Sequence, residues 1–140
     1  MAIRNIDKGY ISTGIPDTST YISLPMKFAG AADYVDVTAT FNKVGRIICM
    51  TLPSVMSQIV TTGAYFESSL PAGYESDIMT SQFVYVSSYV INGTTIALYN
   101  GYIRLDGSSI RIYTTGQFTS GTTNQQGIPV SVSIVYISST

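Results

Sequence analysis

The feature that most constrains the fold of this chain is the stretch between Ser81 and Tyr113. Three Asn-Gly or Asp-Gly pairs divide it, at residues 92–93, 100–101 and 106–107. Such pairs, placed between runs of β-branched and aromatic residues, are the strongest short-range signal for a β-hairpin. Around the last pair, apolar residues alternate with polar ones, so one face of each predicted strand is apolar. We therefore expect an antiparallel meander with a turn at each of the three pairs.

The same alternation recurs outside the meander. It is clearest over residues 35–42 and 130–136, and a more continuous apolar run covers residues 47–52. No segment shows three turns of the 3.6-residue period that marks an amphipathic helix. Short strands separated by turn residues at this spacing predict an all-β protein, an antiparallel β-sandwich or jelly roll of about eight strands.

The length of 140 residues indicates a single core, and we expect one β jelly-roll domain to cover residues 31–140. Residues 1–30 are less regular, and Pro16 and Pro25 would interrupt a helix there. We expect this part to be an N-terminal arm or docking segment with short strands. The pattern fits either a strand that completes the sheet or a segment that docks to another protein.

Charged residues are scarce in this chain. They make up 11% of the sequence, against about 25% in a typical soluble domain, while 45% is hydrophobic. So few charges leave apolar surface to be buried against another chain, and we expect a homo-oligomer. The net charge of −1, without a basic run, argues against nucleic-acid binding. No apolar run is long enough for a signal peptide or a membrane span, so we expect no membrane insertion and synthesis in the cytoplasm of the producing cell.

The chain contains no histidine, which removes the commonest general base and the imidazole metal ligand. An enzyme would have to rely on carboxylates, and Glu67, Glu75 and Asp77 lie within one short stretch. A pair of carboxylates is what a glycosidase requires, but charged residues beside a turn are usually solvated. We expect neither a cofactor nor a metal. The single cysteine, Cys49, lies in an apolar run and is expected to be buried.

The eleven tyrosines are the most unusual feature of the composition. Tyrosine mixed with Ser, Gly and Asn is typical of recognition loops, because it offers a large, stiff and amphipathic contact surface. Tyrosines within strands are explained by β propensity, whereas those near turns are better candidates for contacts. The predicted ligand or receptor contacts are such tyrosines and nearby loop amides: Tyr65, Tyr74, Tyr89, Asn92, Asn124 and Gln125.

Four segments together resemble a known class of domain. They are LPAGY at 70–74, NGYIRLDGSSIRIY at 100–113, GQFTSGTT at 116–123 and VSVSIVYI at 130–137. This pattern, from Leu70 to Ile137, resembles the C-terminal head domains of phage tail fibres and virion spikes, which are similar to the C1q and tumour-necrosis-factor jelly rolls. The resemblance implies a trimer around a three-fold axis, with recognition by exposed loops.

These observations favour a non-enzymatic viral structural protein, a fibre head or surface decoration protein that forms a homotrimer on the virion surface. Its expected partner is a host surface glycan or protein, or another virion protein. The subunit contact is predicted at Tyr102, Arg104, Arg111 and Tyr113, where the arginines can pair with carboxylates of a neighbour. Two alternatives stay open: a carbohydrate-binding module or lectin, and a glycan-cleaving enzyme.

Overall fold

The computed structural model describes residues 19–31, 33–59, 65–89, 96–115, 118 and 124–140 of the chain. Within these ranges the chain forms ten β-strands, and no helix there is long and apolar enough to cross a membrane. The strands are β1 (Ser19–Phe28), β2 (Val35–Val44), β3 (Ile47–Leu52), β4 (Val55–Ser57), β5 (Tyr65–Ser69), β6 (Thr80–Tyr89), β7 (Ile96–Asp106), β8 (Ser109–Thr114), β9 (Gln125–Ile128) and β10 (Val132–Ile137).

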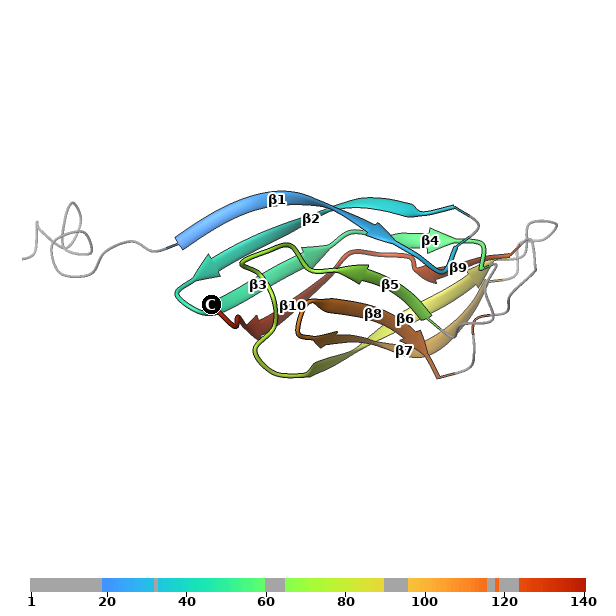
Figure 1. The fold of residues 1–140 in the computed structure, drawn as a ribbon. Coiled ribbons are helices and arrows are strands. Elements are labelled where there is room, and N and C mark those ends of the chain that lie inside the picture. Colours follow the sequence, from blue (N-terminus) through green and yellow to red (C-terminus); the bar gives the residue numbers. More distant parts are fainter. Residues whose placement is uncertain (1–18, 32, 60–64, 90–95, 116–117, 119–123) are drawn as a thin grey trace, which may run out of the picture.

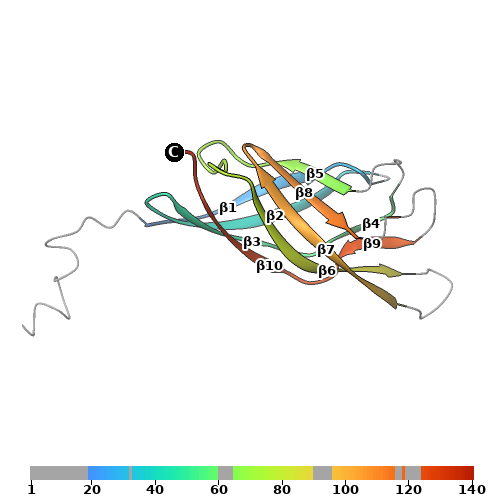
Figure 2. The ribbon, with the colours of Figure 1, turned by 90° about the horizontal axis from the view of Figure 1, so that it is seen from below.

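The strands form two sheets that lie face to face (Figures 1 and 2). The four-stranded sheet has the order β1-β2-β3-β10, and the six-stranded sheet has the order β4-β9-β6-β7-β8-β5. All pairs among these ten strands are antiparallel. The predicted all-β sandwich is therefore confirmed, with ten strands in the described part of the chain where about eight were expected.

The core follows from the alternation read in the sequence. On β3, Ile48, Met50 and Leu52 point between the sheets and are buried, and Ile103 and Leu105 of β7 meet them from the other sheet as part of one cluster. Burying a side chain of this size contributes about 1.5–3 kcal/mol each. Because side chains alternate along a strand, the residues between them are left on the outer faces of the sandwich.

One of the three predicted turns is confirmed and one is wrong. Asp106-Gly107 closes the hairpin between β7 and β8, and Gly107 takes the positive φ of 59° that such a turn requires. Asn100-Gly101, in contrast, lies inside β7. A Cβ atom at Gly101 would overlap the carbonyl oxygen of Tyr113 on β8, so this glycine allows close strand approach and makes no turn. The pair at 92–93 lies outside the described residues.

The strand β1 belongs to the sandwich. It pairs with β2 along its whole length, from Ser19 opposite Val44 to Phe28 opposite Val35. Beyond its end, Ala29 forms an isolated bridge with Glu67 of β5, which links the edges of the two sheets. Residues 1–18 lie outside the described ranges, so the arm stays a prediction there.

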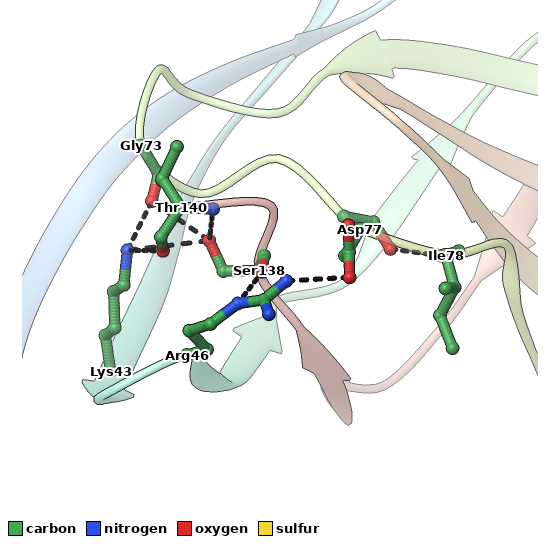
Figure 3. Close-up of polar contacts among 8 residues, drawn as sticks. Lys43, Arg46, Gly73, Asp77, Ile78, Ser138 and Thr140 are labelled. Carbon is green, nitrogen blue, oxygen red and sulfur yellow. Dashed lines mark hydrogen bonds and ion pairs between the residues drawn. The ribbon is translucent and has the colours of Figure 1, made fainter.

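Two cations hold one end of the sandwich together (Figure 3). Lys43 Nζ, near the end of β2, donates a 2.9 Å hydrogen bond to the carbonyl oxygen of Thr140. Arg46, in the β2–β3 turn, donates 2.9 Å from Nε to the carbonyl oxygen of Ser138 and forms a 2.7 Å ion pair with Asp77. The β2–β3 turn, the 70–78 loop and the C-terminal segment are thereby joined.

Candidate functional site

The outer face of the six-stranded sheet carries a row of aromatic side chains. Register places Tyr65 of β5 opposite Tyr113 of β8, Tyr113 opposite Tyr102 of β7, and Tyr102 opposite Phe83 of β6. Residues directly opposite each other on neighbouring strands point to the same face. We call these four residues the aromatic row. They cross four strands that are separated in sequence by turns and loops.

Within the aromatic row, each ring lies next to a ring on the neighbouring strand. Tyr102 and Tyr113 are stacked, with ring centroids 4.8 Å apart and planes 13° apart. Tyr65 lies 5.1 Å from Tyr113, whereas Phe83 meets Tyr102 only edge-on, at 6.4 Å. Such pairs contribute about 0.5–1.5 kcal/mol beyond the burial of area. Phe83 ends the row, and its side chain is 81% exposed.

A charged row runs beside the aromatic row. Glu67 lies opposite Arg111, and Arg111 lies opposite Arg104, an arrangement of two like charges that would be unfavourable alone. Each arginine, however, has a carboxylate partner in its own chain: Arg111 with Glu67 at 2.8 Å and Arg104 with Asp106 at 3.2 Å. The hydrogen bond from Arg111 to Glu67 raises the pKa of the guanidinium, and Tyr113 adds to the effect. The row is therefore neutral overall.

A shallow hollow lies at the Phe83 end of the aromatic row. It has a volume of about 160 Å³ and is lined by Phe83, Val84, Tyr85 and Asn100. Phe83 and Tyr85 point to the same side of β6, and Asn100 of β7 lies directly opposite Tyr85. The hollow is smaller than the roughly 300 Å³ at which small-molecule pockets begin. It is thus a contact point on an open face, without room to enclose a whole ligand.

The four residues predicted as a subunit contact lie together on this face. Tyr102 and Tyr113 form the stacked centre of the aromatic row, and Arg104 and Arg111 form the middle of the charged row. Whether a neighbouring subunit covers them stays a prediction. Tyr65, predicted from its position near a turn, joins the same surface as the first residue of β5.

The other predicted ligand contacts lie elsewhere or outside the described parts. Tyr74 packs on Phe41 with ring centroids 4.8 Å apart, next to the core, and it is not part of the outer face. Gln125 is exposed at the start of β9 and pairs with Tyr89, the last residue of β6, while Asn124 directly precedes β9. Asn92 lies outside the described residues, as does the side chain of Tyr89.

Sequence reasoning did not predict that Phe83, Tyr85 or Asn100 would be a contact residue. The alternation of Phe83 and Tyr85 is visible in the sequence and places both on one side of β6. Aromatic residues at alternate positions usually indicate the core-facing side, and only the pairing of β6 with β7 shows that they face outwards. Asn100 belongs to an Asn-Gly pair, which predicts a turn. The sequence therefore does not indicate that Asn100 lies on the face of strand β7.

The three carboxylates considered for catalysis are each engaged in a different contact. Glu67 pairs with Arg111, Asp77 pairs with Arg46, and Glu75 accepts a 2.7 Å hydrogen bond from the N–H of Gly73. In the described parts of the chain, no group of three or more potential metal ligands comes together.

Comparison with known proteins gives a likeness in structure. No protein-family model matches the sequence, and no curated protein matches it. Among solved structures, the chain is similar to the reovirus attachment protein sigma1 in complex with α-2,3-sialyllactose, with a TM-score of 0.55 and 12% identity. The match covers 87% of this chain and 66% of that chain. At this identity the likeness shows the fold: a β-rich architecture shared with a viral attachment protein. The likeness to C1q and tumour-necrosis-factor heads stays a prediction.

Proposed function

We propose that this chain is a non-enzymatic viral structural protein on the virion surface, either a fibre head or a decoration protein. It forms a homotrimer and binds a host surface molecule or another virion protein through the outer face of the six-stranded sheet. The observation that carries the proposal is the aromatic row, which is half-buried at its three tyrosines and ends in the exposed Phe83 beside the hollow, on a fold shared with a viral attachment protein.

The chemistry of this face supports binding. Contiguous exposed apolar surface marks interaction sites in soluble proteins, whereas single exposed apolar residues do not. Tyr and Arg are also the residues that dominate binding energy in protein interfaces. Here they stand on β-strands, which hold them in place without the ordering cost that a loop would incur.

The engagement of the carboxylates favours a binding protein over the alternative of a glycan-cleaving enzyme. Glu75 and Asp77 each hold the 70–78 loop by a separate contact, whereas Glu67 lies on the edge strand β5 and is bound to Arg111 of the neighbouring strand. A glycosidase needs two carboxyl groups facing one cleft. The lectin alternative overlaps with the proposal, since a glycan is one of the host molecules considered.

For the trimer contact, the outer face of the four-stranded sheet is the better candidate. Arg104 and Arg111 already have carboxylate partners in their own chain, so they do not need those of a neighbour. The four-stranded sheet instead presents an apolar patch at the end near the β2–β3 turn. Register brings its members together in two adjacent rows: Tyr21, Val44, Ile47, Val135 and Ile137.

The apolar patch suits a protein contact. Its members are between 44% and 76% exposed, and none of them is charged. Cys49, which was expected to be buried, lies half-buried among them, because its neighbours Ile48 and Met50 take the core side of β3. Strands of 10, 10, 6 and 6 residues, at roughly 16 Å² of sheet per residue, give this face on the order of 500 Å². This area is that of the whole outer face, of which the apolar patch is a part, and it is smaller than the roughly 800 Å² per partner of a standard interface.

Binding to cell surfaces tests the proposal. Fluorescently labelled protein is mixed with a panel of bacterial and animal cells, and bound protein is measured by flow cytometry. We expect saturable binding to at least one cell type, and a loss of about tenfold or more in affinity for Tyr85→Ser, as for an interface hot spot. Thr38→Ser, on the outer face of the other sheet, is the matched control. Absence of binding to every cell type would contradict a host surface molecule as the partner, and equal binding by Tyr85→Ser and wild type would contradict the assignment of this face.

A further inference from the structure

We infer that the hollow on β6 and β7 binds an uncharged sugar residue, with the ring of Phe83 packed on the sugar and the amide of Asn100 bonded to its hydroxyls. This inference rests on the proposed function, because it names the ligand class of the same face. The observations that support it are the exposed ring of Phe83, the side-chain amide of Asn100 and the charge balance of the surface.

The apolar half of the contact is Phe83. Within the described residues its ring has one aromatic neighbour, Tyr102, which it meets edge-on, and 81% of the side chain is exposed. A ring face is therefore open to a ligand, unlike those of the stacked Tyr102 and Tyr113. One face of a pyranose ring consists largely of C–H groups, which pack favourably against the negative face of an aromatic ring.

The polar half of the contact is Asn100, with Tyr85 beside it. The backbone carbonyl of Asn100 accepts hydrogen bonds from Thr115, whereas its side-chain amide makes none within the described residues. An amide offers both donors and an acceptor, and a phenol hydroxyl does the same. Sugar hydroxyls need both kinds of partner, so an amide and a phenol around an open ring match them.

The charges of the face indicate that the sugar is neutral. None of the four residues that line the hollow is charged. Arg104, on the same face, is paired with Asp106, and its buried Nε atom has no hydrogen-bond partner among the described residues. An anionic sugar would have to displace the Asp106 carboxylate to pair with Arg104. We therefore expect a neutral sugar, in contrast to the sialyllactose bound in the sigma1 complex.

A glycan array that pairs sialylated glycans with their asialo counterparts tests the inference. We expect wild-type protein to bind neutral glycans and to favour each asialo form over its sialylated partner. Phe83→Ala and Asn100→Asp should each lower affinity at least tenfold, whereas Phe83→Tyr keeps the ring and should bind nearly as wild type. Leu98→Ala, an exposed apolar change on the same face outside the hollow, is the matched control. Binding of a neutral sugar should also change less than about twofold between about 0.05 and 0.5 M salt.

The outcomes separate this inference from the proposed function. Preference for sialylated glycans would overturn the neutral ligand, and the attachment role would stand. Cell binding that depends on Tyr85 without any glycan bound would overturn the sugar, again leaving attachment in place. Binding to neither cells nor glycans would overturn both the sugar and the host surface molecule as partner. Equal glycan binding by Phe83→Ala and wild type would place the sugar elsewhere and contradict the assignment of the hollow.

Discussion

Tyr136 shows how a single side chain joins distant segments of this protein. Its hydroxyl donates a 2.7 Å hydrogen bond to the carbonyl oxygen of Tyr74, and the Tyr74 ring packs on Phe41. Tyr136 is almost fully buried, and this burial raises the pKa of its hydroxyl above the usual value, with a further effect from Glu75. The 70–78 loop is held to β10 by a group that must stay protonated.

This gives a prediction for Tyr136→Phe. A raised pKa in the folded state means that the contribution of Tyr136 is fully present below the unfolded-state pKa of about 10 and is lost as the pH rises above it. At pH 8 the variant should be about 1 kcal/mol less stable, because one buried hydrogen bond is lost. Between about pH 8 and pH 11, wild type should lose more stability than the variant, as measured by urea unfolding. Equal losses in the two proteins would contradict the role of this hydroxyl.

The β6–β7–β8 meander positions the aromatic row, and Gly101 allows its close packing. A Cβ at this position would overlap the Tyr113 carbonyl oxygen and lie 3.0 Å from a methyl group of Val86. The neighbouring strand would have to move, and strand backbone yields less easily than a flexible side chain. Register between β7 and β8 is what places Tyr102 against Tyr113.

We therefore expect Gly101→Ala to destabilise the fold by about 1–3 kcal/mol, the cost of overpacking a strand contact. The measurement is the free energy of unfolding in urea. Asn100→Ala, at the exposed neighbouring position, should change it by no more than about 0.5 kcal/mol and serves as the control. If both variants are as stable as wild type, β7 and β8 have room for a side chain at Gly101 and the close strand contact is wrong.

The two outer faces of the sandwich differ in chemistry, and the proposed division between ligand contact and subunit contact rests on this difference. One face presents aromatic rings, an amide and a balanced charged row, while the other presents an apolar patch without charge. A face with varied polar groups suits a ligand, and a cluster of exposed apolar side chains suits another copy of the chain. A three-fold axis beside the β2–β3 turn would bring three copies of the apolar patch together.

Light scattering tests this assignment of the two faces. We expect wild type to have the mass of a trimer at micromolar concentration and Ile47→Asp to be a folded monomer, because a buried unpaired charge opposes association. Thr38→Asp, on the same sheet but away from the patch, should remain trimeric, as should Arg104→Ala on the opposite face. A monomeric wild type would contradict the trimer. Dissociation of the trimer by Arg104→Ala but not by Ile47→Asp would place the subunit contact at the charged row.

The fold class and most of the strands could be predicted from the amino-acid sequence alone. Alternation with a period of two is a local property, so residues 35–42 and 106–107 predicted strand β2 and the β7–β8 turn correctly. The same alternation indicated that tyrosine and arginine would meet on one face around Tyr102 and Arg104. Local patterns were misleading at Gly101, because an Asn-Gly pair can serve either a turn or a close strand contact.

Which strands are neighbours, and which face is exposed, depended on the tertiary fold. The approach of Tyr65 to Tyr113 requires pairing between β5 and β8, and no local signal encodes a contact between segments so distant in the chain. The same holds for Phe83, which is exposed because it lies on the outer side of β6, opposite Tyr102 of β7. Strand register is set by burial across the whole core, because a slip by one residue would move every side chain to the opposite face.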